Sequence, residues 1–274
     1  MKNFKYIILC CLLTSFFASC DLFKMDNYGV PGETLKGSVV DVVTGDPVYA
    51  DVTNNSTRIR LMELSWTATA VPNNYDFPCM RDGTFNNTKL FKGYYNIRID
   101  GPFIPLVRLN QQGDTIADES RYVEISGVTD VKFQVQPFLK IEWVGTPTID
   151  AAKGTITASF KVTRAVSPDD FKAKIEPMGG YDPNFLNVTD IKLFISESSY
   201  VGLNDSNGTP YTVTQNYSGN DFDSLLGQTI TLTSNGVIAK GRTVFIRAAA
   251  RISYQTQGVS RYNYNAAVRV DMPQ

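Results

Sequence analysis

Hydrophobic and polar residues alternate in many short runs from Thr34 to the end of the chain. Successive side chains of a β-strand point to opposite faces, so a period of two is typical of strands with one buried face. The clearest runs are residues 94–99, 131–136, 155–162, 191–195 and 244–253. Only residues 169–176 and 221–226 read as helical turns. Because Asn, Gly and Ser separate the runs, the sequence predicts an all-β chain of antiparallel β-sandwiches.

The chain divides at Pro137, which ends the alternating run before it because proline cannot donate a hydrogen bond to a strand ladder. We therefore expect two antiparallel sandwich domains in series, residues 34–137 and 138–274. Residues 20–33 are polar, contain Gly and Pro, and read as a spacer ahead of the first domain.

Residues 1–19 read as a signal peptide rather than as a folded element. Two lysines precede an apolar run, residues 6–17, that is too short to span a bilayer. Small residues then stand directly ahead of Cys20. This ending resembles the bacterial lipobox, which implies cleavage before Cys20 and acylation of its thiol, a stable membrane anchor. The alternative is an ordinary secretory signal followed by a chance cysteine.

Cysteine and histidine usage limits the chemistry of the mature chain. Cys79 is the only thiol left once the signal peptide is removed and Cys20 carries lipid, so no intrachain disulfide can form. Its apolar neighbours predict a buried core residue.

The chain has no histidine, which excludes Ser-His-Asp and Cys-His catalysis and the usual zinc sites. A glycosidase needs only two carboxylates, but nothing marks a particular pair, so we expect no enzyme, no cofactor and no metal.

The charge balance is nearly neutral. The chain has 26 Lys and Arg and 27 Asp and Glu residues, and loss of the two lysines of residues 1–19 leaves 24 against 27. This argues against a nucleic-acid partner, because such binding depends on clustered Lys and Arg.

Residues 204–208 superficially resemble a calcium loop. Leu203 and Thr214, however, occupy the positions of the first and last acids of such a loop, so we interpret residues 204–208 as a turn.

Aromatic residues near expected loops are the candidate binding residues. A planar ring set against the apolar C–H face of a sugar, with polar neighbours that fix the hydroxyls, suits glycan binding. The candidates are Trp66, Tyr75, Phe77, Tyr181, Tyr200, Tyr211 and Tyr217. The alternative for each ring is packing in a sandwich core. We interpret Trp143, within the expected first strand of the second domain, as a core residue.

Two segments of the first domain resemble a carboxypeptidase-regulatory-like, or transthyretin-like, sandwich. Residues 35–48 read as a strand, a Thr-Gly turn, and a proline that opens a second strand. Residues 82–95 contain Asp-Gly-Thr-Phe followed by Lys-Leu-Phe-Lys-Gly-Tyr-Tyr, which is similar to the closing signature of that fold. Gly45 and Gly83 permit the tight turns that the pattern needs.

The mature chain further resembles a Bacteroidetes lipoprotein family of unknown function (DUF3823-like) on residues 58–66, 82–95, 251 and 262–264. The resemblance implies a C-terminal immunoglobulin- or fibronectin-like sandwich and a link to Sus-type polysaccharide utilisation loci. It also implies attachment to the outer membrane, facing the cell surface, beside a TonB-dependent transporter and its lipoprotein lid. There the protein would bind a polysaccharide or oligosaccharide or assist its uptake. The alternative is a structural subunit of the transporter complex that contacts no ligand.

Residues 114–116 and 223–225 resemble the short O-glycosylation motif of that phylum. The resemblance implies modification at Thr115 and Ser224. The alternative is that both are ordinary loop residues at the surface.

Overall fold

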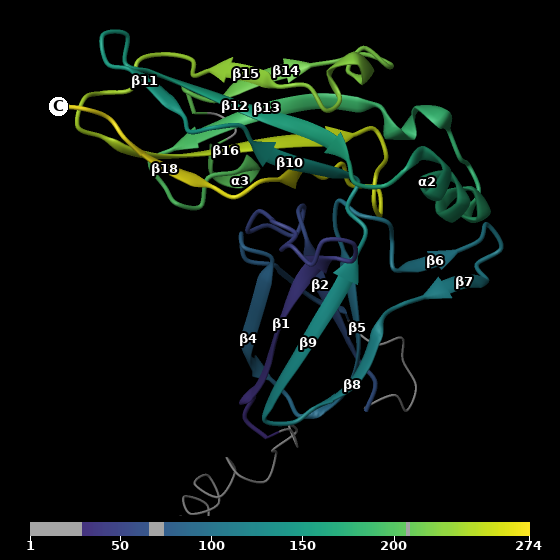
Figure 1. Cartoon of the computed structure of the whole chain (residues 1–274). Helices are drawn as coiled ribbons and strands as arrows, with labels where there is room; N and C mark the ends of the chain where they lie inside the picture. The colour runs from purple at the N-terminus through teal and green to yellow at the C-terminus, as the bar shows by residue number, and fades with distance from the viewer. Residues whose placement is uncertain (1–28, 66–73, 207–208) are drawn as a thin grey trace, which may run out of the picture.

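Residues 29–65, 74–206 and 209–274 are described by the structure, a computed structural model. They form two β-rich modules, one above the other (Figure 1). Strands dominate both modules and helices are few and short, which confirms the all-β prediction. Among these residues no helix has the length and apolar character needed to cross a membrane.

The N-terminal module contains two main sheets and a two-stranded hairpin. The first has the order β4 (Thr84–Leu90), β1 (Glu33–Asp41), β9 (Val128–Val135). The second has the order β3 (Asn74–Pro78), β2 (Arg58–Glu63), β5 (Gly93–Asp100), β8 (Arg121–Ile125). One pairing differs from the antiparallel expectation, because β1 runs parallel to β9 while it pairs antiparallel with β4 (Figure 1).

Apolar residues of the alternating runs fill the space between these two sheets. Among them are Leu35, Val39, Ile59, Leu61, Phe85, Ile97, Ile99, Phe133 and Val135. Cys79 is fully buried in the same cluster, which confirms its interpretation as a core residue. Burial raises the pKa of this thiol far above its ordinary value, so it stays a neutral core side chain.

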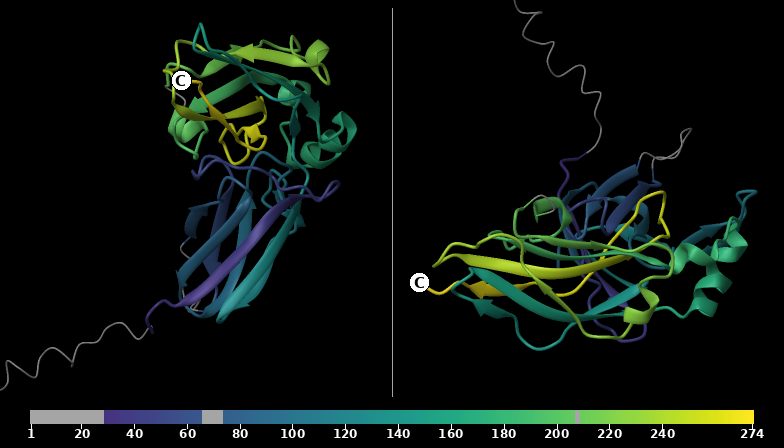
Figure 2. Two further views of the ribbon diagram at one scale, coloured as in Figure 1. Left: turned by 60° about the vertical axis from the view of Figure 1, so that its left-hand side comes forward. Right: turned by 90° about the horizontal axis from the view of Figure 1, so that it is seen from above.

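The C-terminal module is a second pair of sheets, and all of its pairings are antiparallel. One sheet contains β10 (Leu139–Trp143), β12 (Thr155–Arg164), β11 (Thr148–Asp150) and β15 (Ile230–Thr233). The other contains β14 (Val213–Asn216), β13 (Val188–Ser196), β16 (Thr243–Ile252), β17 (Asn263–Tyr264) and β18 (Val268–Asp271). Figure 2 shows the two sheets as layers when the module is seen from above.

Short helical segments lie at the ends of this module. They are α2 (Pro168–Ile175), η1 (Glu176–Met178), η2 (Pro183–Leu186), α3 (Leu203–Ser206) and η3 (Asp223–Leu225). The Ser167 side chain caps α2 by accepting a hydrogen bond from the amide of Asp170, and Phe171 packs in the core. Helical turns occur in both stretches where they were expected. A further short helix, α3, begins at Leu203 and overlaps residues 204–208, which were interpreted from the sequence as a turn.

A hairpin of the N-terminal module reaches the C-terminal module. It consists of β6 (Val107–Leu109) and β7 (Thr115–Asp118) and extends beneath α2 (Figure 1). At its tip, Gln111 lies so close to Gly179 that a Cβ on this glycine would collide with it. The hairpin therefore forms one side of the contact between the modules.

Buried hydrogen bonds join the modules along β16 and β17. The Arg247 guanidinium donates to the carbonyls of Asn265 (2.9 Å), Ala50 (2.7 Å) and Arg81 (3.2 Å). The Asn263 amide donates to the carbonyl of Pro102 (3.0 Å) and accepts from the amide of Leu139 (3.2 Å). These side chains are almost completely buried.

A second group of contacts lies beside the first. Arg261 donates to the carbonyls of Asn54 and Ser56, and Asp51 accepts a 2.8 Å hydrogen bond from the amide of Asn204. A small apolar cluster fills the space between, with Tyr49 packed on Phe194, Val201, Ala249, Tyr262 and Tyr264. The junction is therefore a packed and hydrogen-bonded interface rather than a loose tether.

Candidate functional site

The junction between the modules contains a groove of about 350 Å³, which we call the junction groove. Three distant stretches line it: residues 41–49 from the end of β1 onward, residues 137–143 at the start of and along β10, and residues 263–266 around β17. Clefts at domain boundaries are common ligand sites, and this volume falls in the range that holds a small ligand.

Trp143 brings the largest ring to the groove. It is the last residue of β10, is partly buried, and its Nε1 donates to the carbonyl of Ala266 at 2.9 Å. Its ring meets that of Phe160 edge to face, with centroids 6.2 Å apart. The indole thus packs against the core, as interpreted from the sequence, and also lines the groove in a fixed orientation. Tyr49, also partly buried, lines the groove as well.

Charged groups stand on the same strand as the indole. Lys140 Nζ lies 3.0 Å from a carboxylate oxygen of Glu142 and 3.9 Å from one of Asp46. The hydrogen bond to Glu142 is the main reason that the pKa of Lys140 is raised. Lys140 and Glu142 project from the opposite face of β10 to Trp143 but line the same groove, and with Asp46 they provide both donors and acceptors for hydroxyl groups.

Two asparagines line the inner end of the groove. Asn263 uses its whole amide in the contacts with Pro102 and Leu139. The Asn265 carbonyl oxygen accepts from the amide of Ala248 at 2.9 Å, while its Nδ2 is buried and has no partner among the described residues. Buried donors are nearly always paired, so this unpartnered Nδ2 is an exception within the wall of the groove.

Of the three carboxylates that line the groove, Asp41 is buried and accepts a hydrogen bond from the amide of Val43. Glu142 and Asp46 are more than half exposed and both engage Lys140. A catalytic acid of a glycosidase instead sits in an apolar environment that keeps it protonated. The arrangement can therefore hold a polar ligand against an aromatic ring, and binding is the chemistry it supports.

The structure places the predicted candidates on separate elements. Trp66 lies outside the described residues. Tyr75 is half exposed on β3, and its ring stands 5.9 Å from that of Phe77, which packs on the core of the N-terminal module. Tyr200 is half exposed after β13, with the Arg81 guanidinium 5.6 Å above its ring.

The remaining predicted aromatics pack against the core of the C-terminal module. Tyr181, Tyr211 and Tyr217 are all partly buried there. Tyr217 meets Phe222 edge to face with centroids 4.9 Å apart, and Tyr181 meets Phe185 at 6.2 Å. None of the predicted residues within the described ranges lines the junction groove.

The other predicted sites fall as follows. Thr115 at the start of β7 and Ser224 in η3 are both exposed, and their modification stays a prediction. Cys20 lies outside the described residues. In the described part of the chain no cluster of His, Cys, Asp and Glu could hold a metal ion. Residues 203–206 form the short helix α3 instead of an open loop.

Solved structures resemble this one, although no family model and no curated protein matches the sequence. A DUF3823 family protein from Bacteroides uniformis ATCC 8492 is 50% identical, with a TM-score of 0.84 over 89% of this chain and 100% of that one. A candidate carbohydrate-binding protein from the same strain is 19% identical, with a TM-score of 0.60 over 88% and 100%. A DUF3823 family protein from Parabacteroides merdae ATCC 43184 is 17% identical, with a TM-score of 0.57 over 88% and 100%. The last two likenesses show the fold alone.

Proposed function

Because this chain belongs to the DUF3823 family, we propose that it is a non-catalytic lipoprotein of the outer-membrane surface that binds glycan in the junction groove. The observation that carries the proposal is the fixed indole of Trp143, which lines the junction groove together with Lys140, Glu142 and Asp46. An aromatic face flanked by a few polar groups suits the C–H face and hydroxyls of a sugar.

Two further points support binding rather than catalysis. The fold is shared with a protein from Bacteroides uniformis that is named for carbohydrate binding, and none of the similar structures reported above is named an enzyme. Fold alone never decides function, so the chemistry of the groove has to carry the argument. Its exposed carboxylates, paired with one lysine, favour binding.

The anchor and the partners form the second part of the proposal. Acylation of Cys20 would hold the protein at the outer membrane, and the likeness of the sequence start to a lipobox supports this. A Sus-type transporter and its lipoprotein lid are the proposed neighbours, on the strength of the family resemblance. In this setting the protein captures a polysaccharide or oligosaccharide at the cell surface and passes it to the transporter.

Affinity electrophoresis of residues 21–274 through gels that contain soluble glycans tests the binding. We expect at least one glycan to retard the protein, and Trp143→Ala to weaken retardation about tenfold, equivalent to ~1.4 kcal/mol. Because the ring also packs on Phe160, the exposed Glu142→Gln provides a second variant that leaves the core intact and is expected to weaken binding.

Tyr75→Ala is the matched control, since this half-exposed ring lies outside the groove and its loss should leave retardation unchanged. Retardation that is lost in Tyr75→Ala but kept in both groove variants would contradict the site. Unchanged migration across a broad panel of glycans would contradict direct binding and favour a structural subunit.

A further inference from the structure

A second hollow, of about 370 Å³, lies over the outer face of the sheet β3-β2-β5-β8, and we call it the arginine pocket. Arg60, Arg98 and Asp100 line it from the sheet, Leu109 from β6, and Met178 and Gln257 from the C-terminal module. It shares no lining residue with the junction groove. It is closed in part by the module junction, so the arrangement of the two modules shapes it.

The strand register places two like charges side by side in this pocket. Arg60 on β2 is directly opposite Arg98 on β5. Like charges at such a cross-strand pair are destabilising unless acids nearby compensate them. The distribution of the neighbouring acids therefore decides what the pocket attracts.

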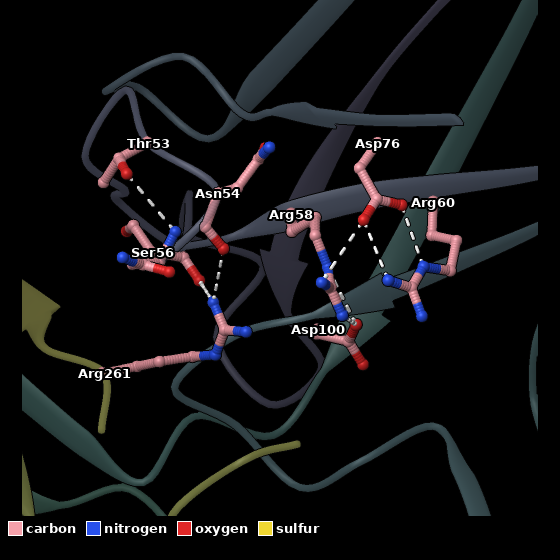
Figure 3. A network of polar contacts seen from close by, with 9 residues as sticks. Thr53, Asn54, Ser56, Arg58, Arg60, Asp76, Asp100 and Arg261 are labelled. Carbon is pink, nitrogen blue, oxygen red and sulfur yellow. Dashed lines mark hydrogen bonds and ion pairs between the residues drawn. The ribbon is translucent and has the colours of Figure 1, made fainter. Parts of the chain in front are cut away.

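Two aspartates close to this pair, Asp76 and Asp100, form ion pairs with Arg60 and Arg58 and not with Arg98 (Figure 3). Asp76 receives two 2.8 Å hydrogen bonds from Arg60 and lies 3.3 Å from Arg58. Asp100 receives hydrogen bonds of 2.5 and 3.2 Å from Arg58. The fork of Arg60 is the main cause of the lowered pKa of Asp76, so this carboxylate is committed to Arg60.

Arg98 is left without a carboxylate partner in the described part of the chain. Its Nε donates to the side-chain oxygen of Asn96 at 2.8 Å, and its two terminal nitrogens have no acceptor there. Asp118 feels the charge of Arg98, but the hydrogen bond from Ser120 is the main cause of its lowered pKa. No ion pair joins Asp118 to Arg98.

Arg261 adds a further positive charge close to this cluster. It is buried, and its Nε and Nη2 have no partner among the described residues. Asp100 and Arg58 are the charged groups that act on it, and Figure 3 shows it extending toward them. Among the charged residues that line the pocket, Arg60 is paired with Asp76 and Asp100 with Arg58, so Arg98 is the lining guanidinium that no carboxylate of the described residues neutralises.

We infer that the arginine pocket binds the carboxylate of an acidic sugar residue, with Arg98 as its principal donor. The planar guanidinium presents two parallel N–H groups that match a carboxylate. Leu109, Val107 and Met178 give the pocket apolar walls against which the C–H groups of a sugar ring can pack. The inference rests on the proposed glycan-binding function and assigns it a second, charge-selective subsite.

Isothermal titration of residues 21–274 with D-galacturonate, and with D-galactose as the neutral match, tests this subsite. We expect galacturonate to bind and galactose to give no comparable heat at this pocket. Arg98→Gln keeps a hydrogen-bonding group beside Asn96 but removes the fork, so it should weaken galacturonate binding about tenfold or more. Arg98→Lys keeps the positive charge but lacks the planar fork, so its affinity for galacturonate should lie between those of the unsubstituted protein and Arg98→Gln.

Arg269→Gln is the control, because this exposed arginine lies on β18 and does not line the pocket. Absence of galacturonate binding, or binding that persists in Arg98→Gln, would overturn the inference. If neutral glycans still retard the protein in gels and this retardation still depends on Trp143, the proposed glycan-binding function stands even though the acidic-sugar subsite is disproved.

Discussion

Arg247 is the largest fully buried side chain among the residues that the structure describes, and its hydrogen bonds go to carbonyl oxygens rather than to carboxylates. Burial lowers the pKa of this guanidinium to about 10, so it remains charged at neutral pH. Two of its three acceptors, Ala50 and Arg81, belong to the N-terminal module. One side chain of β16 therefore holds together backbone segments that are far apart in the sequence.

We predict that Arg247→Met lowers the free energy of unfolding by about 3 kcal/mol, because three carbonyls would lose a charged donor inside a packed interface. Urea unfolding followed by tryptophan fluorescence measures this change. Arg269→Met is the control: its side chain is 63% exposed, and its loss should change stability by less than about 0.5 kcal/mol. Equal stability of the two variants would show that Arg247 is not needed at the junction.

The sequence separates binding aromatics from packing aromatics poorly. Tyr75 and Tyr200 are half exposed, whereas Tyr181 and Tyr217 pack on the core, yet all four were proposed on the same local pattern. A tyrosine near Gly or Asn is buried or exposed according to which strand lies over it. Trp143 was interpreted as a core residue because it lies in an expected strand, and only the structure shows that it also lines a groove.

At the scale of the elements, period-two alternation predicted most strands well but failed to predict what covers their outer faces. β16 was expected to be half buried. In the structure its residues 246–250 are all buried, because the N-terminal module covers the face that carries Arg247 and Ala249. An alternating sequence pattern indicates only that one face of a strand is buried. When a second module covers the other face, the sequence of the strand itself does not indicate it.

The parallel pairing of β1 with β9 was also not predicted, since register between distant strands is not encoded locally. Gly37 lies within this pair, opposite Val131. A Cβ on Gly37 would approach the Val131 carbonyl oxygen to 1.9 Å and the Phe85 ring to 2.5 Å. The close approach of three strands at this point thus requires glycine.

We predict that Gly37→Ala destabilises the protein by about 3 kcal/mol, because a backbone carbonyl must move to admit the methyl group. Gly45→Ala is the control, since a Cβ there meets no atom within 4 Å and only its φ of +76° is unfavourable, which costs about 1 kcal/mol. Thermal unfolding of the two variants measures the difference. A Gly45 variant that is as unstable as the Gly37 variant would contradict the packing argument.

At the scale of the whole molecule, the candidate site is assembled by the fold. Residues 41–49, 137–143 and 263–266 meet only because the modules are fixed against each other. Each stretch looks ordinary by itself: a turn after a strand, an edge strand, and a polar stretch near the C-terminus. The sequence could therefore predict the class of function through its resemblance to a family, but it could not locate the groove.

The absence of histidine determines how stability depends on pH. In the folded state the pKa of Asp76 is lowered by its hydrogen bond to Arg60, and that of Asp118 by its hydrogen bond to Ser120. The two carboxylates therefore contribute to the free energy of unfolding at pH values above their ordinary pKa of 3.8, and this contribution is lost as the pH falls below that value. Burial raises the pKa of Cys79, Tyr262 and Tyr264 above their ordinary values of 9.0 and 10.0.

Above about pH 9 the unfolded chain therefore releases protons that the folded chain keeps, and stability falls as the pH rises. Between about pH 5 and 8 no side chain titrates at its ordinary pKa, so the free energy of unfolding should be constant there. Urea midpoints measured from pH 3 to pH 10.5 test this profile. Cys79→Ala should delay the alkaline loss until the tyrosines begin to titrate near pH 10. A slope between pH 5.5 and 8 would require a buried carboxylate or amine with a strongly displaced pKa, and so contradict this assignment of the titrating groups.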